Sequence, residues 1–236
     1  MRSYGQYCGL AAGLDVVGDR WTLLIVRELL ILGPSRYTDL LRGLPGIPTN
    51  LLANRLREME TAGLVERQEP APPVATPLVS LTERGRALLP VIEAVAAWGA
   101  PTLGSVGRDA EFRTHWLVLP LRRHLRDSDP ASPPVRIEVQ AGDGVIFVEA
   151  KDGTIDVHVG RPTRPDAVIT GAPDAVLATL LGHATLSEAR KRGVRITGDA
   201  RAVSRIIPEG APGTSKSPTT QFRHVGGLRP GRDDSA

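Results

Sequence analysis

Residues 49–57 carry polar side chains of the types that contact nucleic acid. Asn50, Asn54 and Arg57 are three or four positions apart, so they share one face of the segment if it is helical. Amide and guanidinium groups donate hydrogen bonds in a fixed, forked geometry, which suits base edges and phosphate oxygens. The opposite face would carry three apolar residues that need a core: Leu52, Leu56 and Met59. A helical hairpin with a solvated polar face has similar content, so both interpretations stay open at this point.

The surrounding sequence predicts two helices joined by a tight turn. The first helix is expected over residues 36–42 and stops at 44–48, because proline cannot continue a helix and glycine tolerates positive φ. Pro48 and Thr49 open the second helix, since proline is tolerated in a first turn and threonine is a good cap. Gly63 then ends it. This order is that of a helix-turn-helix, which presents its second helix to the DNA major groove.

Flanking motifs extend this pattern in both directions. They are Cys8, GDRWTLLIVREL from Gly18, RYTDL from Arg36, LPGI from Leu44, GLVER from Gly63 and LTERG from Leu81. Their order and spacing resemble the HxlR-type winged-helix transcription regulators of bacteria, over about residues 7–99. The resemblance implies a dimeric DNA-binding domain, a recognition helix at residues 48–61 and a β-wing after it. We expect a double-stranded DNA operator to be contacted by Arg36, Thr49, Asn50, Asn54, Arg55, Arg57 and Arg67.

The charge of this region is balanced rather than basic. Residues 1–105 contain ten Arg and ten acidic residues, and residues 68–83, where the wing falls, contain Glu69 but no Lys or Arg. Phosphate attraction supplies most non-specific affinity, so we expect modest DNA binding and a small contribution from the wing. Helical phase also puts Arg55 nearest the buried side, where its head would reach an acidic side chain.

Apolar spacing supplies the remaining elements of this half. A mostly buried helix is expected over residues 21–32, and two strands joined by a wing loop are expected within residues 65–81. Thr82 and Glu83 would begin a final helix, whose apolar stripe ends at Trp98. Such a terminal helix pairs with its copy in a dimer or packs on its own domain, and the sequence leaves both open.

Cys8 is the one residue in this region with reaction chemistry of its own. Many HxlR-type proteins carry a cysteine here, sometimes used to sense oxidants or electrophiles, so redox sensing is one interpretation. A reactive thiol needs a lowered pKa from nearby cations or a helix N-terminus. The other interpretation, which we favour from sequence, is a buried small apolar residue near a dimer interface.

Length and composition predict a two-domain protein. The chain has 236 residues, one cysteine and no apolar run of membrane-spanning length, so we expect a cytoplasmic protein without disulfides or membrane partners. Residues 99–107 are rich in Gly and Pro and read as a linker. We therefore expect a DNA-binding domain at 1–105, a second domain at 106–210 and a polar, flexible tail at 211–236.

The second domain changes from helical to alternating periodicity. A helix in which Pro120 can introduce a kink is expected over residues 112–125, before strands at 135–140, 145–151, 154–160 and 166–170. Asp-Gly turns between the first three strands predict an antiparallel meander. Two short helices, a last strand at 194–196 and a helix at 199–207 follow. This order, with PDAVITGAPDAVLATLLG and TLSEARKRGVRITGD, resembles the sterol-carrier-protein-2-like (SCP2) domain over about residues 109–207.

The SCP2 resemblance implies an apolar cavity that takes lipids or other hydrophobic small molecules. Phe112 and Trp116, on the apolar face of the first helix, are the expected lining residues. The alternative is a fully packed core with no ligand. The five histidines are scattered, and no phosphate loop, nucleophile elbow or HExxH motif is present, so we expect no metal, no cofactor and no enzymatic activity.

The expected fold class is α+β: an N-terminal winged helix-turn-helix domain followed by an SCP2-like antiparallel sheet with packed helices. The expected function is a homodimeric transcriptional regulator, a repressor rather than an activator, whose second domain senses a hydrophobic small molecule. The alternative is a lipid or small-molecule carrier with weak or no specific DNA binding, which the charge balance of the first domain keeps open.

Overall fold

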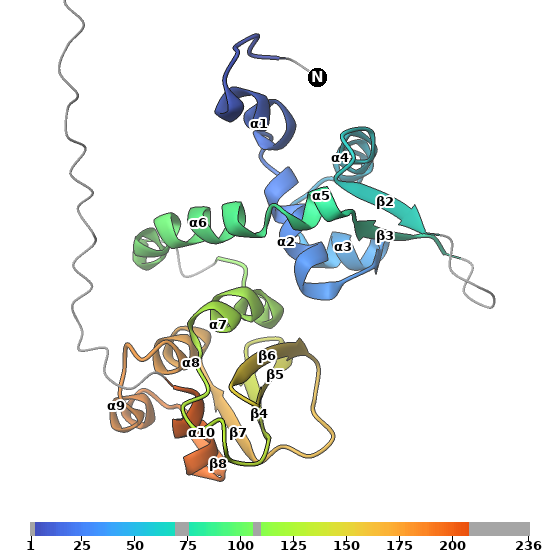
Figure 1. Ribbon diagram of the computed structural model, residues 1–236. Helices are drawn as coiled ribbons and strands as arrows, with labels where there is room; N and C mark the ends of the chain where they lie inside the picture. Colours follow the sequence, from blue (N-terminus) through green and yellow to red (C-terminus); the bar gives the residue numbers. More distant parts are fainter. Residues whose placement is uncertain (1–2, 69–75, 106–109, 208–236) are drawn as a thin grey trace, which may run out of the picture.

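The computed structural model describes residues 3–68, 76–105 and 110–207 of the chain. Two bodies follow one another, a mostly helical first domain and a second domain built on a sheet, with α7 (Val118–His124) lying between them (Figure 1). Within the described residues, no helix is long and apolar enough to cross a membrane. No group of three His, Cys, Asp or Glu side chains in that same part could hold a metal ion.

The first domain has a winged helix-turn-helix architecture. Its elements are α1 (Gly9–Val17), α2 (Thr22–Leu32), β1 (Ser35–Arg36), α3 (Tyr37–Gly43), α4 (Thr49–Thr61), β2 (Val65–Gln68), β3 (Leu78–Leu81), α5 (Glu83–Arg86), α6 (Leu89–Gly99) and the 3₁₀ helix η1 (Ala100–Ser105). The three strands form an antiparallel sheet in the order β1-β3-β2. The two-residue strand β1 was not expected, because a strand this short has no sequence periodicity.

The expected single helix over residues 82–98 is wrong in one respect, because it is two helices. Thr82 begins the first as predicted, and its hydroxyl accepts a hydrogen bond from the N–H of Gly85 at 3.1 Å. The helix ends after one turn and α6 begins anew at Leu89 with Pro90 in its first turn. Proline removes a donor and its ring crowds the carbonyl four residues before it, so a helix begins there rather than continues.

The second domain places one face of a five-stranded sheet against helices. Its elements are η2 (Thr114–Leu117), α7, β4 (Val135–Ala141), β5 (Gly144–Lys151), β6 (Thr154–Val159), β7 (Ala167–Gly171), α8 (Pro173–Leu180), α9 (Leu186–Lys191), β8 (Arg195–Gly198) and α10 (Ala200–Ile206). Helices α7, α8 and α10 contact the strands on that face. The fully buried side chains Ile137, Ile146 and Ile169 line it.

The strand order of this sheet is β6-β5-β4-β7-β8. The β4-β5-β6 meander is antiparallel as predicted, and Asp152 and Gly153 turn one hairpin with φ of 51° and 79°. The expectation of a wholly antiparallel sheet is wrong at one pairing, because β7 runs parallel to β4. The chain crosses over from β6 at the sheet edge to β7 beside β4, which makes the sheet mixed.

Candidate nucleic-acid interface

Helix α4 lies at the outer edge of the first domain, on the side away from the second domain (Figure 1). Its inner face is held by the buried side chains of Leu52, Leu56 and Met59, as the apolar spacing predicted. Asn50 and Asn54 are exposed on the other face. The helix is therefore fixed by its apolar stripe and presents a polar surface to solvent.

Arg57 and Asn54 form a connected pair on this surface. The Arg57 guanidinium donates through Nη2 to Oδ1 of Asn54, one helical turn earlier, and the Arg57 carbonyl accepts from the Thr61 hydroxyl at 3.0 Å. Both Arg57 and Asn54 are exposed. The exposed pair therefore places an amide and a guanidinium side by side, and both groups are of the types that bind base edges in the major groove.

The start of α4 differs from the prediction. The N-cap position is Pro48 rather than Thr49, and no side chain caps the helix. Instead, the Tyr37 hydroxyl of α3 donates to the carbonyl of Thr49, which attaches the beginning of α4 to the preceding helix. Thr49 is exposed in the first turn of α4, where its hydroxyl stays accessible to a phosphate.

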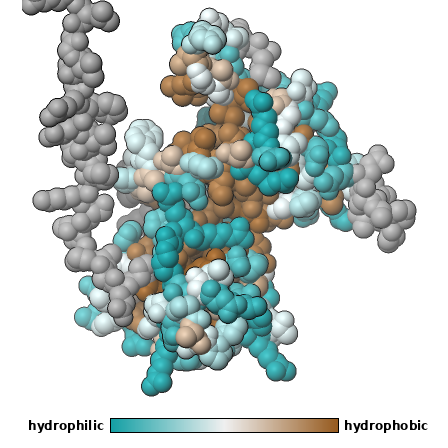
Figure 2. Space-filling view, viewed as in Figure 1, coloured by the Kyte–Doolittle hydropathy of each residue, from teal (hydrophilic) through white to brown (hydrophobic). Residues whose placement is uncertain are grey.

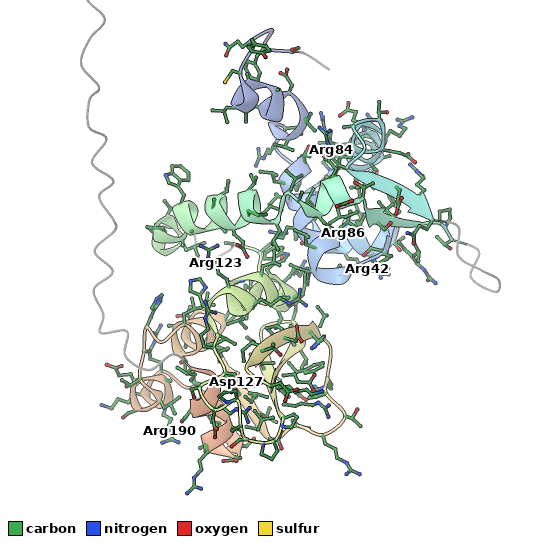
Figure 3. The ribbon with its side chains drawn as sticks, viewed as in Figure 1. Arg42, Arg84, Arg86, Arg123, Asp127 and Arg190 are labelled. Atoms are coloured by element: carbon green, nitrogen blue, oxygen red, sulfur yellow. The ribbon has the colours of Figure 1, made fainter. Side chains whose placement is uncertain are left out.

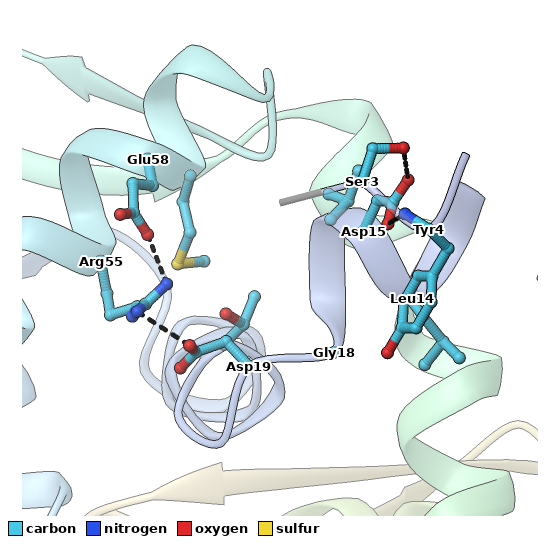
Figure 4. A pocket seen from close by; sticks show the side chains of 11 residues that line it. Ser3, Tyr4, Leu14, Asp15, Gly18, Asp19, Arg55 and Glu58 are labelled. Atoms are coloured by element: carbon cyan, nitrogen blue, oxygen red, sulfur yellow. Dashed lines mark hydrogen bonds and ion pairs between the residues drawn. The ribbon is translucent and has the colours of Figure 1, made fainter. Parts of the chain in front are cut away.

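Arg55 does not lie on the exposed face of α4, and its expected DNA contact stays a prediction. Its Nη2 lies 2.8 Å from Oδ2 of Asp19, its Nη1 donates to Glu58, and its side chain is only 24% exposed (Figure 4). Two carboxylates therefore neutralise the guanidinium and aim it toward the turn between α1 and α2. The residue attaches α4 to the rest of the domain.

The remaining cations around α4 differ in how free their charge is. Arg36 is exposed at the N-cap position of α3. Arg67 of β2 is exposed, but its Nε lies 3.2 Å from Oε2 of Glu60 on α4, so part of its charge is compensated. Arg84 in the one-turn helix α5 is also exposed (Figure 3). Sequence analysis gave Arg84 no role, although its place directly after β3 of the wing was a usable signal.

Comparison with known proteins agrees with this geometry. The sequence model of the HxlR-like helix-turn-helix family matches residues 16–105. The uncharacterized HTH-type transcriptional regulator YdzF of Bacillus subtilis is 37% identical over 89 residues, which is 36% of this chain and 79% of YdzF. The chain belongs to the HxlR-like helix-turn-helix family.

Other comparisons concern both halves of this HxlR-like protein. The HTH-type transcriptional regulator YodB of Bacillus subtilis is 37% identical over 90 residues, 38% of this chain and 79% of YodB. The solved structure of the redox regulator HypR in its reduced form is 30% identical, covers 40% of this chain and 93% of HypR, and has a TM-score of 0.37. The sequence model of the SCP-2 sterol transfer family matches residues 128–207. The chain is therefore an HxlR-type DNA-binding regulator with an SCP2 domain.

The tip of the HxlR-type wing, residues 69–75, lies outside the described residues, and Glu69 is among them. The expectation that this loop, which has no Lys or Arg, contributes little to DNA affinity stays a prediction.

A cavity of about 520 Å³ lies in the HxlR-like domain, between the N-terminal segment, α1 and α4 (Figure 4). It is lined by Ser3, Tyr4, Leu14, Asp15, Val16, Gly18, Asp19, Thr22, Arg55, Glu58 and Met59. Asp15 orders the N-terminal segment, since its carboxylate accepts from the Ser3 hydroxyl at 2.7 Å and the Tyr4 N–H at 2.9 Å. Sequence analysis expected a pocket in the second domain, whereas this cavity lies in the first.

The two expected pocket residues of the SCP2 domain, Phe112 and Trp116, have different surroundings. Trp116 donates its indole N–H to Glu28 of α2 at 2.8 Å, so this side chain reaches the junction with the first domain. Phe112 meets the Trp116 ring edge-on with the centroids 6.4 Å apart, and it also lies against the β4-β5 turn, where a Cβ on Gly142 would be 2.9 Å from its ring. Their role in lining a ligand pocket stays a prediction.

Cys8 is exposed at the N-cap position of α1. The interpretation of this residue as a buried apolar side chain is therefore wrong within one chain. The backbone N–H groups of Ala11 and Leu10, at the start of α1, hold the pKa of the Cys8 thiol below its ordinary value. These N–H groups are the unpaired donors of the helix start, and they favour the thiolate.

Cys8 should consequently react with iodoacetamide at neutral pH faster in the native chain than in the unfolded chain, by roughly two- to tenfold. Mass spectrometry of alkylated protein over time measures the rate, with the same protein in concentrated urea as the control. Because the pKa is lowered, the native rate should also reach its plateau at lower pH. A native rate equal to the unfolded rate would show that the helix start does not activate this thiol.

Proposed function

We propose that this chain acts as a homodimeric repressor that binds a partly palindromic operator and is controlled by a hydrophobic small molecule in its SCP2 domain. The exposed polar face of α4 carries the proposal, because it lies away from the second domain and is free to enter a major groove. A two-fold dimer would present two such helices to half-sites about one helical turn apart. A dimer at a promoter represses without needing a further partner.

Exposed apolar residues on the N-terminal segment, α1 and α6 support the dimer. Leu10 of α1 is 72% exposed and Trp98 of α6 is 84% exposed in one chain. Most other large exposed apolar side chains lie on these two helices or on the N-terminal segment before α1: Tyr4, Tyr7, Leu14, Val91 and Val95. Figure 2 shows apolar surface on α1 and on the body beneath it. Large contiguous apolar surface marks an interaction site, and a second copy of α1 and α6 offers matching surface.

A Leu10→Glu, Trp98→Glu double variant should therefore be monomeric, whereas the wild-type chain should have twice the mass of one chain in light scattering. Losing the second recognition helix should weaken operator binding about 100-fold, because the two half-sites are then no longer bound together. Val159→Glu is the matched control, since Val159 is an exposed apolar residue of β6 in the second domain. An unchanged mass for the double variant would place the dimer interface elsewhere.

For the SCP2 domain we propose a binding role and no catalytic step. The apolar face of its sheet and helices α7, α8 and α10 enclose a continuous apolar layer, in which Leu121, Leu180 and Ile206 are fully buried. A hydrophobic molecule would enter between these helices and the sheet. The match of residues 128–207 to the SCP-2 sterol transfer family supports this choice of ligand class.

The test uses the full chain, palmitate and cholesterol as separate probes, and the DNA directly upstream of the chain's own reading frame. A bound probe at a large excess over its Kd should raise the melting temperature by about 5 °C. The same probe should release the DNA in a gel-shift assay. Binding of a probe without any DNA complex would favour the carrier alternative, and flat melting curves with both probes would favour a packed core without a ligand.

A further inference from the structure

A fully buried carboxylate lies where the two domains meet. Glu28 of α2 has no exposed surface, although it is an acidic residue of the DNA-binding domain. Its neighbour Arg27 donates to Oε1 through Nε at 3.0 Å and through Nη2 at 2.7 Å. A buried charge is costly unless it is paired and its other lone pairs are hydrogen-bonded, so the remaining partners of Glu28 matter for the fold.

Those remaining partners come from the second domain. Nε2 of His115 lies 2.7 Å from Oε2 of Glu28, and the indole N–H of Trp116 donates to Oε1 at 2.8 Å. Arg27 also stacks its guanidinium on the Trp116 ring, 4.4 Å from the centroid. Arg27, Glu28, His115 and Trp116 therefore form one cluster across the junction, which we call the Glu28 clasp.

On the side of the second domain, the clasp is anchored to the sheet. His115 and Trp116 belong to η2, whose first residue, Thr114, is buried. The Thr114 hydroxyl accepts from the N–H of Gly144 at 2.9 Å, and the Thr114 N–H donates to Asp143 at 3.1 Å. Asp143 lies in the turn between β4 and β5, and Gly144 is the first residue of β5. A movement of that turn would therefore move η2.

On the side of the first domain, the clasp is packed against the helix-turn-helix. A Cβ added to Gly43 would lie 2.2 Å from Oε2 of Glu28, so the carboxylate fits only because this residue is glycine. Gly43 is the last residue of α3, and the chain enters α4 only six residues later. The same carboxylate thus contacts η2 of one domain and the end of α3 of the other.

We propose that the Glu28 clasp transmits the state of the SCP2 domain to the recognition helix. Displacing η2 breaks both hydrogen bonds to Glu28, and removing one donor while η2 stays docked leaves the buried carboxylate short of a partner, which costs more than the loss of an exposed hydrogen bond. Docking of η2 therefore adds to the packing that holds α2 and the end of α3 in place. This coupling rests on the proposed function for its ligand and DNA, but the coupling itself is measurable without either.

A second contact across the junction provides a comparison. Nη1 of Arg123 in α7 lies 2.7 Å from Oε2 of Glu93 in α6, with side chains that are 48% and 26% exposed (Figure 3). Exposed ion pairs contribute little, since water and salt screen them. Removing this pair should therefore leave the coupling nearly intact, whereas removing one donor of the buried clasp should not.

Hydrogen exchange in the full chain tests the coupling. Trp116→Phe keeps a six-membered aromatic ring and removes the indole N–H together with the five-membered ring that carries it, and it should speed amide exchange in a peptide spanning α3 about tenfold. Arg123→Gln is the matched control at the same junction and should change this rate less than about threefold. Glu28→Gln should in turn speed exchange in η2 and α7. If that variant fails to fold, Trp116→Phe and His115→Gln still report on the clasp.

DNA binding gives the second measurement. Trp116→Phe should weaken binding of the upstream DNA about five- to tenfold, because α3 and α4 are then less well preorganised. Exchange rates in α3 that stay within twofold of wild type in folded Trp116→Phe protein would overturn the proposal, whatever the DNA result. If the wild-type chain binds no DNA while the exchange effect is present, the proposed function fails and the coupling stands.

Discussion

An Arg57→Ala, Asn54→Ala double variant is expected to bind the upstream DNA about 100-fold more weakly than the wild-type chain. A side chain that reads a base edge contributes about 1–3 kcal/mol to discrimination. The two residues are hydrogen-bonded to each other in the free protein, so their single effects should not add fully. Gel shifts at two salt concentrations separate the roles, because losing a phosphate contact lowers the salt dependence while losing a base contact lowers specificity.

Arg190→Ala is the control for that experiment, since Arg190 is an exposed cation of α9 in the second domain (Figure 3). It removes the same charge as Arg57→Ala at a site far from α4. If the double variant is folded by circular dichroism and binds within twofold of the wild type, α4 is not the recognition helix. The carrier function would then be favoured over the regulator.

Asp127→Asn should lower the free energy of unfolding by about 3 kcal/mol, because it removes the negative partner of a buried ion pair and leaves the positive one. Asp127 lies in the segment after α7, and its two oxygens are 2.6 Å from Nε and 2.9 Å from Nη2 of Arg205 in α10. Arg205 also donates to the Pro133 carbonyl at 2.7 Å. Removing the carboxylate leaves this guanidinium buried and uncompensated. Urea unfolding followed by circular dichroism measures the loss.

The same pair predicts a pH dependence. The Arg205 guanidinium holds the pKa of Asp127 below its ordinary value, and backbone N–H groups of Asp129 and Gly153 act in the same direction. A depressed folded pKa adds stability above the unfolded value of about 3.9, and this stability is lost as pH falls through the folded value. The wild type should therefore lose more stability than Asp127→Asn on acidification below about pH 4.

Asp174→Asn is the matched control for both measurements. Asp174 pairs with Arg192 at 2.9 Å, but their side chains are 74% and 46% exposed. Breaking this exposed pair should cost less than about 1 kcal/mol and should leave the acid dependence unchanged. Equal effects of the two substitutions would mean that the buried pair contributes no more than an exposed one.

Local periodicity predicted most elements and the face each would bury. Leu52, Leu56 and Met59 are spaced for a helix and lie in the core, because 3.6 residues per turn places them on one side whatever the partner. The Asp-Gly pair at 152–153 predicted its hairpin for an equally local reason, since both residues tolerate positive φ. Sequence alone therefore determined most element types, the helix-turn-helix and the hairpins.

Tertiary structure alone decided which charged side chain meets which partner. Helical phase predicted that Arg55 would reach an acidic side chain, but only the fold shows that this partner is Asp19, 36 positions earlier in the sequence. Trp116 has the spacing of a core residue, yet its N–H reaches Glu28 in the other domain. The parallel pairing of β7 with β4 is likewise set by where the chain returns to the sheet. Periodicity specifies the face on which a side chain lies, whereas its partner depends on how elements distant in sequence pack together, and no local spacing carries that information.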